Sequence, residues 1–312
     1  MHTVSVVIPC FNSERFIQEA IDSVMGQTVT PIEIICVDDG STDGSLPKLQ
    51  DLSKQIPILQ VIAQKNAGAT HARNRGLEQA QGDYVQFLDA DDALLPEKIE
   101  RQLAIVEKNN APGLVIGSYS KFNSNGDLIY TQSQEYQRAS LWLKLMRTQL
   151  GITSSNLFKR SEVVAVGGWD ESLKSSQEYD LMYRMMKGGA QVSLCPAIDT
   201  EVRQRNPESI TSSNKGENWK RYIDLRLQMR EHILSKDIEV SSDEVNQVLF
   251  DSMRQLYPYD RKEALRLLRK EIPKGFKPAV SAISSAGYIK LYKLFGFDLS
   301  ERLRSFIRNE QG

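Results

Sequence analysis

Short apolar runs separated by helical patterns in the first hundred residues predict four buried strands. The runs cover residues 4–8, 32–37, 58–62 and 84–88, and the first is rich in β-branched side chains, as expected of strands that are buried on both faces. Between the first two runs, apolar residues recur with a helical period from 16 to 25. This alternation favours an α/β fold with a mostly parallel sheet, right-handed crossovers and flanking helices. Either Asn12 or Ser13 is expected to cap the first helix.

Downstream of these runs the pattern becomes mixed and then purely helical. Asn125-Gly126 predicts a hairpin turn, and a helix over 178–187 should end at Gly188-Gly189. Ser, Thr, Asn and Gly dominate residues 208–216, and no strand pattern follows. We therefore predict an α/β domain over residues 1–210 and a helical C-terminal extension over residues 211–312.

One segment of this extension, residues 282–295, sets aromatic and aliphatic side chains among Lys290 and Lys293. Two interpretations are open. The favoured one is a helix that packs on its own domain. The other is an amphipathic helix that lies on a membrane surface, which would give the protein a peripheral membrane contact at the inner face.

Composition narrows the class of protein. The 312 residues include 39 Lys and Arg against 40 Asp and Glu, so the net charge is -1, and we expect no nucleic-acid partner. Cys10, Cys36 and Cys195 lie far apart without zinc-ligand spacing, and Cys10 and Cys36 are expected to be buried free thiols. The chain shows no signal-peptide pattern and no long uninterrupted apolar stretch, so we expect a cytoplasmic protein.

The most unusual stretch begins as the apolar run 84–88 and continues into three carboxylates, Asp89, Asp91 and Asp92. Clustered carboxylates are costly unless a cation or hydrogen-bond donors compensate them. On a continuing strand Asp89 and Asp91 would share a face, and two hard oxygen ligands suit Mg²⁺ or Mn²⁺. The alternative is structural, with Asp91 or Asp92 capping the helix that follows.

Polar segments follow all four predicted strands, at residues 9–12, 38–39, 66–73 and 89–92. The carboxyl ends of parallel strands open on one rim, so these segments should share a crevice. Acidic side chains there can accept hydrogen bonds from a base or a ribose, and Arg73 can donate to a diphosphate. Each feature alone also has a structural interpretation: Asp38-Asp39-Gly40 as a turn and Arg73 as a surface ion pair. Together they predict a nucleoside-diphosphate site that lacks the glycine fingerprints of dinucleotide-binding and P-loop proteins.

Five motifs carry a family resemblance. They are Val7-Ile8-Pro9-Cys10-Phe11-Asn12, Val37-Asp38-Asp39-Gly40-Ser41-Thr42-Asp43, Asn66-Ala67-Gly68 with Ala72-Arg73-Asn74-Arg75-Gly76, Asp89-Ala90-Asp91-Asp92, and Gly167-Gly168-Trp169-Asp170-Glu171. In this order they resemble the family-2 glycosyltransferases, inverting enzymes with the GT-A fold. The resemblance extends over roughly residues 3–205.

The resemblance implies an enzyme that moves a sugar from a nucleotide sugar, expected to be UDP-linked, to a saccharide or lipid-linked acceptor. Glycan or cell-surface polysaccharide synthesis is the implied process, and Mn²⁺ or Mg²⁺ the implied cofactor. The metal would be held by Asp91 with Asp89. The implied nucleotide-binding residues are Pro9, Phe11, Asn12, Asp38, Asp39, Asn66, Gly68, Arg73 and Asp89. The implied acceptor-side and donor-side residues are Gly168, Trp169, Asp170 and Arg205.

Two positions depart from the family pattern. The family usually begins the helix near 178 with Glu-Asp-x-Asp-Leu and uses the first Asp as the base, whereas this chain has Gln177-Glu178-Tyr179-Asp180-Leu181. Glu178 would then be the catalytic base, and its structural alternative is a carboxylate favoured by the helix dipole. Arg205 stands where the family often has a His. These departures keep open a catalytically silent nucleotide-sugar-binding protein, and a nucleotidyltransferase is a third hypothesis.

Overall fold

The protein is described here from a computed structural model that covers the backbone of residues 2–135, 140–204 and 214–309, and the side chains of these residues up to 305. The chain divides into two compact units, Met1–Leu141 with Thr148–Pro207, and Trp142–Arg147 with Glu208–Gly312. The short segment 142–147 thus belongs with the C-terminal unit. The predicted domain boundary at 210/211 lies outside the described residues.

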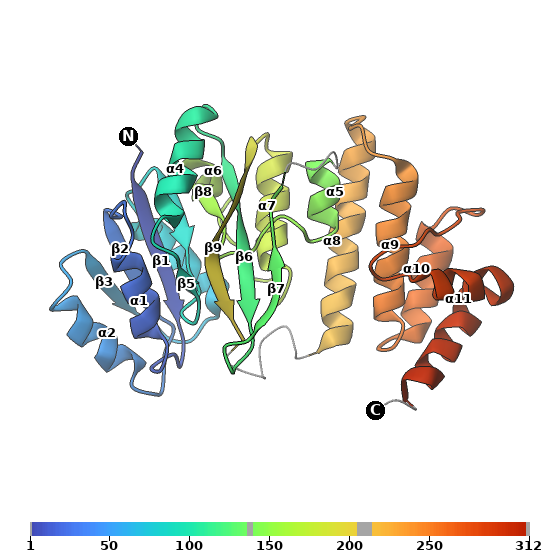
Figure 1. Ribbon diagram of the computed structural model, residues 1–312, viewed down its shortest axis with the longest axis horizontal. Helices are drawn as coiled ribbons and strands as arrows, with labels where there is room; N and C mark the ends of the chain where they lie inside the picture. Colours follow the sequence, from blue (N-terminus) through green and yellow to red (C-terminus); the bar gives the residue numbers. More distant parts are fainter. Residues whose placement is uncertain (1, 136–139, 205–213, 310–312) are drawn as a thin grey trace. The chain divides into compact units, whose positions relative to one another are not determined.

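A nine-stranded mixed sheet forms the centre of the first unit (Figure 1). Its order is β3-β2-β1-β4-β8-β6-β9-β5, with β7 beside β6. Strands β1 to β4 are parallel to their neighbours within this group, as predicted, whereas β5, β7 and β8 pair antiparallel. The strands are β1 Val4–Cys10, β2 Glu33–Asp38, β3 Leu59–Ala63, β4 Tyr84–Phe87, β5 Ala93–Leu94, β6 Leu114–Phe122, β7 Leu128–Gln132, β8 Leu157–Lys159 and β9 Val192–Arg203.

Helices connect the strands of this unit. They are α1 Ile17–Met25, α2 Ser45–Ser53, α3 Ala69–Gln79, α4 Lys98–Lys108, α6 Arg160–Ala165 and α7 Gln177–Lys187. The prediction that Asn12 or Ser13 caps α1 is wrong, because the helix begins after Phe16 without a side-chain cap. Both side chains serve the preceding loop instead: Asn12 Oδ1 accepts from the Thr42 N–H, and the Ser13 hydroxyl donates to the Phe11 carbonyl.

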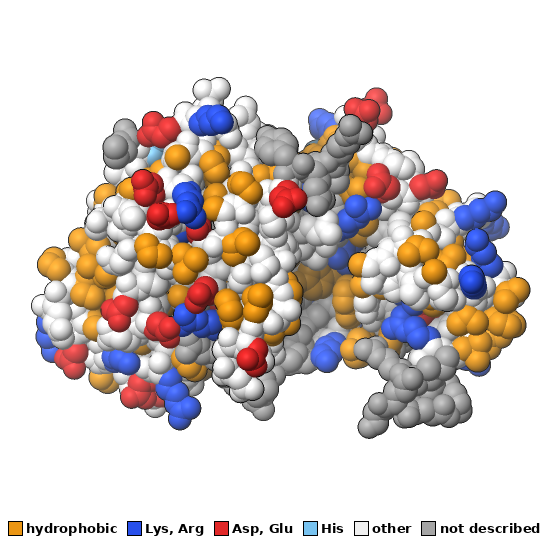
Figure 2. Space-filling view, viewed as in Figure 1, with side chains coloured by type: hydrophobic (Ala, Val, Ile, Leu, Met, Phe, Trp, Pro, Cys, Tyr) orange, Lys and Arg blue, Asp and Glu red, His pale blue; other side chains and the backbone are white. Residues whose placement is uncertain are grey.

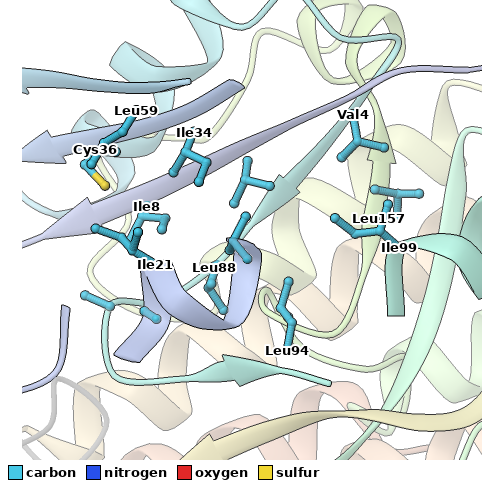
Figure 3. Close-up of a cluster of buried hydrophobic side chains, with 14 of the residues drawn as sticks. Val4, Ile8, Ile21, Ile34, Cys36, Leu59, Leu88, Leu94, Ile99 and Leu157 are labelled. Carbon is cyan, nitrogen blue, oxygen red and sulfur yellow. The ribbon is translucent and has the colours of Figure 1, made fainter. Parts of the chain in front are cut away.

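The buried core of the unit lies between the parallel strands and the helices that cover them (Figure 3). Ile8 and Ile34 from neighbouring strands meet Ile21 of α1, and Leu88 continues the core just beyond β4. Burying such side chains is the main favourable term in folding. Cys10 and Cys36 are buried free thiols, as predicted. Burial raises the pKa of Cys10 to about 11. This packing holds the carboxyl ends of β1, β2 and β4 in place.

The second unit is helical in its described residues, as predicted. Its helices are α5 Leu141–Met146, whose first residue belongs to the first unit, α8 Lys215–Ser235, α9 Ser242–Leu256, α10 Arg261–Glu271 and α11 Ala286–Asn309. Arg226 of α8 donates to the carbonyl of Met146 at 2.7 Å, which ties α5 to this bundle. α11 contains a sharp break at Gly296. Within the part of the chain that the structure describes, no helix is both long and apolar enough to cross a membrane.

Candidate active site at the strand ends

Asp39 organises the first part of the rim. It follows β2, and its backbone N–H donates to the carbonyl of Cys10 at the end of β1, 2.8 Å away. Its buried carboxylate accepts from the backbone N–H groups of Ala67 and Gly68 and from Gln64 Nε2, each at 2.8 Å. One carboxylate therefore joins the ends of β1 and β2 to the loop after β3, which carries Asn66 on its exposed side.

Asp38 and the loop after β1 complete the corner of the rim that Asp39 organises. Asp38 is buried, and its Oδ2 accepts from the Ser41 N–H at 3.2 Å, whereas its Oδ1 has no hydrogen-bond partner among the described residues. A buried acceptor without a donor is costly, so this oxygen is suited to a ligand N–H or O–H. Phe11 leaves its ring exposed, and an aromatic face can stack on a base. Pro9 pairs in register with Val37 and lies half-buried beneath this loop.

A buried arginine holds the acidic segment. Arg73 Nη2 donates to Asp89 Oδ1 at 2.6 Å, and its side chain is 8% exposed while that of Asp89 is 38% exposed. The guanidinium carbon lies 4.7 Å from the centre of the Trp169 ring, and Nη1 lies 3.4 Å from the Gln177 amide oxygen. Its Nε is buried without a partner among the described residues. Arg73 thus holds the half-exposed Asp89 from the buried side of the site.

The segment 89–92 forms a turn between β4 and β5. The proposed shared strand face of Asp89 and Asp91 is therefore wrong, because β4 ends at Phe87. The capping alternative is also wrong, because β5 intervenes and α4 begins only at Lys98. The turn is closed by the Asp92 N–H, which donates to the Asp89 carbonyl at 3.0 Å.

Ser154 and Asp92 anchor this turn from inside. The Ser154 hydroxyl donates to Asp92 Oδ2 at 2.6 Å and accepts from the Asp89 N–H at 3.1 Å. The Arg203 N–H donates to the other Asp92 oxygen at 3.1 Å. Burial, reinforced by the nearby charges of Asp89 and Asp91, raises the pKa of Asp92 well above its ordinary value. The turn therefore concentrates negative charge that a cation would relieve.

The donor set fits a divalent cation that is bound together with a ligand. Asp89 and Asp91 supply hard carboxylate oxygens, which suit Mg²⁺ or Mn²⁺. Among the described residues no group of three or more His, Cys, Asp or Glu side chains is arranged to hold a metal by itself. Since Asp89 also serves Arg73, such a cation would need further oxygens, and a diphosphate carries them.

Glu178 lies in the first turn of α7, next to Gln177, which contacts Arg73. Burial raises the pKa of Glu178, and Asp89 adds to this effect. Hydrogen bonding to its own backbone N–H and the charge of Arg73 act in the opposite direction. The pKa of Glu178 therefore depends on the same Arg73–Asp89 pair that holds the acidic turn. A carboxylate with a raised pKa at this position is suited to accept a proton.

Asp180, two residues after Glu178 in α7, has a structural role. It pairs with Arg184 one turn later, 2.8 Å from Nε. Arg184 Nη1 in turn donates to the carbonyls of Val166 and Gly168 at 2.8 and 2.7 Å. This pair fixes the loop 166–168 to α7.

The Gly168-Trp169-Asp170 loop is placed by Asn74 of α3. The Asn74 amide accepts from the Trp169 N–H and donates to the Trp169 carbonyl, each at 2.8 Å. At Gly168, φ is +70°, and an added Cβ would lie 2.6 Å from Asn74 Oδ1, so only glycine fits. The Trp169 ring is buried against Phe87 and Arg73 and supports the site from behind. Asp170 is exposed and accepts from Ser172 within a turn. Arg205 lies outside the described residues.

Sequence reasoning missed four residues of this site: Gln64, Asn74, Ser154 and Arg203. Asn74 lies beside Arg73 in one of the five motifs, and this neighbourhood could have indicated that it belongs to the site. Ser154 carried none, because it is 62 residues from Asp92 in the chain and only the antiparallel return of the chain brings the two together.

The mixed sheet with helices on its flanks has the GT-A fold. A similar fold occurs in residues 1–349 of TarS from S. aureus, solved in complex with UDP-GlcNAc, with a TM-score of 0.63 at 19% identity over 87% of this chain and 76% of that one. Residues 5–167, just over half of the chain, match the profile of glycosyl transferase family 2, and the chain belongs to this family. The resemblance and the GT-A fold expected from the sequence are confirmed.

Two relatives agree with this assignment. A glycosyltransferase from Rickettsia bellii is 32% identical over 189 residues, which cover 59% of this chain and 27% of that protein. The glycosyltransferase GlyA from Streptococcus pneumoniae is 31% identical over 153 residues, which cover 47% of this chain and 22% of that protein. The match thus spans about a quarter of the length of these relatives.

Proposed function

We propose that the protein transfers a sugar, with inversion, from a UDP-linked donor to a hydroxyl of a saccharide or lipid-linked acceptor. Synthesis of a glycan or a cell-surface polysaccharide, on the cytoplasmic side of a membrane, is the process we propose. The observation that carries the proposal is the contact between Arg73 and Asp89, with Glu178 close enough to sense both charges. This arrangement supports a diphosphate-binding edge and a proton acceptor on one rim.

The donor would lie along the strand ends. The unpartnered Asp38 Oδ1, the exposed Phe11 ring and the loop held by Asp39 suit a uracil base and its ribose. The UDP-GlcNAc complex of TarS supports a UDP-linked donor for this fold. Asn12, Asn66 and Gly68 border this corner and would contribute backbone or amide contacts.

Asp91, with Asp89 beside it, would hold Mn²⁺ or Mg²⁺ together with the diphosphate. The cation would neutralise charge that develops on the departing nucleoside diphosphate. Arg73 keeps Asp89 in place from the buried side. We therefore expect Asp91→Ala to weaken UDP binding in the presence of Mn²⁺, measured by calorimetry. An unchanged affinity would exclude the metal role of Asp91.

Glu178 would take the proton from the acceptor hydroxyl as the hydroxyl oxygen bonds to the anomeric carbon. The bond from that carbon to the phosphate oxygen breaks in the same step, and its electron pair leaves with UDP. A single displacement inverts the anomeric centre, whereas two would retain it. Its raised pKa makes Glu178 a better proton acceptor than an ordinary glutamate. Gly168, Asp170 and Arg205 are proposed for the acceptor side, with Trp169 as the support of Gly168 and Asp170.

The test compares Glu178→Gln with wild type and with Glu107→Gln, an exposed acid on α4. A panel of nucleotide sugars is screened for turnover and for thermal stabilisation. We expect Glu178→Gln to reduce turnover by roughly 10²- to 10⁴-fold with UDP binding retained, and Glu107→Gln to match wild type. Turnover unaffected by Glu178→Gln would refute the base assignment.

Two outcomes would replace the proposal altogether. Nucleotide-sugar binding without turnover in the wild-type protein would favour the catalytically silent alternative, for which Glu178 and Arg205 are the motivation. Release of pyrophosphate in place of UDP would establish a nucleotidyltransferase.

A further inference from the structure

The break in α11 places an apolar tip on the surface of the C-terminal unit. At Gly296 φ is 69° and ψ is -176°, a conformation that is essentially restricted to glycine. The two residues just before it, Leu294 and Phe295, are 74% and 48% exposed. Leu299 and Leu303, one helical turn apart after the break, are 43% and 37% exposed. Figure 2 shows hydrophobic side chains gathered over α11, at the right of the view, with Lys and Arg side chains beside them.

This tip is rigidly mounted. Phe297, directly after the break, is buried and packs edge-on against Phe250 of α9 with ring centres 5.4 Å apart. Tyr288 and Tyr292 of the preceding turns contact the same ring. The buried Glu301 binds Arg254 of α9 at 2.5 Å. The exposed apolar side chains are therefore held in position and are not part of a loose tail.

The acidic and the basic side chains of α11 have different surroundings. Its acids are satisfied by arginines of the same unit: Glu301 by the buried Arg254, and Asp298 by Arg261, whose Nε and Nη2 lie 2.8 Å from its two oxygens. Lys290 and Lys293 are exposed next to the apolar tip, whereas the exposed Arg302, between Leu299 and Leu303, lies 3.2 Å from Asp298. The apolar tip thus stands beside two exposed lysines.

We propose that this tip, made of Leu294, Phe295, Leu299 and Leu303 with Lys290 and Lys293, docks on the surface of a bilayer that contains anionic phospholipids. Apolar side chains would enter the headgroup boundary while the lysines meet lipid phosphates, which is how interfacial amphipathic helices bind. With roughly 200 Å² for a large side chain, the exposed fractions amount to about 400 Å². A stable protein interface needs about 800 Å² per partner, so a second copy of the chain is a poorer occupant. This docking does not depend on the proposed sugar transfer.

The test is co-sedimentation of the full chain with vesicles of phosphatidylcholine, with and without phosphatidylglycerol. Leu294→Ser/Phe295→Ser should reduce binding to the anionic vesicles at least tenfold. Lys290→Gln/Lys293→Gln should reduce it by roughly fivefold per lysine and remove most of its salt dependence. The matched control is Leu234→Ser on α8, since Leu234 is 64% exposed elsewhere in the same unit, and it should bind as wild type does.

A second readout uses a protein that keeps its apolar tip. Phe295→Trp should show a blue shift of its added fluorescence on mixing with anionic vesicles and none with phosphatidylcholine alone. Absence of wild-type binding to anionic vesicles, or equal binding by Leu294→Ser/Phe295→Ser, would overturn the proposal. So would a wild-type dimer in sedimentation analysis that this double variant converts to a monomer, because the tip would then be covered by a second copy.

Discussion

Each unit of the protein contains a buried arginine paired with a carboxylate, but the two pairs differ in how completely they are satisfied. In the C-terminal unit, Arg254 and Glu301 are both 1% exposed. Arg254 also donates to the Ile283 carbonyl and the Ser284 hydroxyl, each at 2.7 Å, and lies over the Tyr288 ring. In the sheet unit, Arg73 is buried, yet its partner Asp89 is half-exposed, and Arg73 Nε has no partner among the described residues.

The difference separates a structural pair from one that is suited to a ligand. A buried ion pair whose hydrogen bonds are complete fixes its neighbours and has nothing left to offer a ligand. A pair that keeps one member at the surface and leaves polar atoms unsatisfied is an incomplete network, and such networks are costly unless a ligand completes them. The same residue types therefore hold α11 in one unit and, in the other, form the incomplete pair for which we propose diphosphate binding.

The largest expected effect comes from breaking the structural pair. Arg254→Met leaves Glu301 buried without its partner and should lower the free energy of unfolding by roughly 3–5 kcal/mol, measured by urea denaturation. Arg254→Met/Glu301→Met should recover much of this loss, because it removes the uncompensated charge. Little loss in the single variant would show that Glu301 finds other compensation, for example from Arg304, 3.4 Å away.

Breaking the pair at the strand ends should act on binding more than on folding. Arg73→Met removes a charge-assisted hydrogen bond and frees Asp89, so we expect UDP affinity to fall by about 1.5–3 kcal/mol, or tenfold to a hundredfold. Arg75→Met on the same helix is the matched control, since Arg75 forms an exposed pair with Glu78 that contributes little. Calorimetric titrations in which the two variants agree would contradict the role of Arg73.

Ser154 offers a smaller change within the acidic turn. Ser154→Ala removes the donor to the buried Asp92 and the acceptor of the Asp89 N–H, and should cost about 1–2 kcal/mol of stability. It should also weaken Mn²⁺-dependent UDP binding, because the turn that carries Asp89 and Asp91 loses its anchor. Ser53→Ala, whose hydroxyl bonds to a carbonyl on the surface of α2, should change neither quantity. Normal binding by Ser154→Ala would mean that Arg203 alone holds Asp92.

Lowering the pH should affect turnover at the candidate active site and the stability of the C-terminal unit in different pH ranges. Burial raises the pKa of Glu178, so its ionised form is lost, and turnover with it, as pH falls through a value above the ordinary glutamate range. Hydrogen bonds from Arg261 and Tyr257 hold the pKa of Asp298 far below its usual range. A lowered folded-state pKa contributes stability that is present above the unfolded pKa and lost only as pH falls towards the folded value. Turnover should therefore decline before the contribution of Asp298 does. A pH profile for kcat with no such limb would argue against Glu178 as the base.

Local patterns sufficed to predict much of the fold. The hairpin at Gly126 and the end of α7 at Gly188 were predicted correctly, because each depends on residues close in sequence. Local patterns did not indicate the length of β9, which runs from Val192 to Arg203. Its second half mixes exposed and half-buried residues with the buried Asp199 and Thr200, and its pairing with β6 and β5 is not visible in local periodicity.

The sequence by itself determined the strand-helix alternation, the helical C-terminal extension and the residues gathered at the strand ends, because these follow from short-range periodicity and from the shared direction of parallel strands. Only the tertiary structure decided how those residues are used. It showed that Asp39 holds a loop, that Trp169 supports Arg73 from behind, and that Ser154 anchors the acidic turn. It also showed that Gly296 exposes the tip of α11. The physical reason is that such contacts join residues far apart in the chain, so they exist only once the whole sheet or bundle has formed.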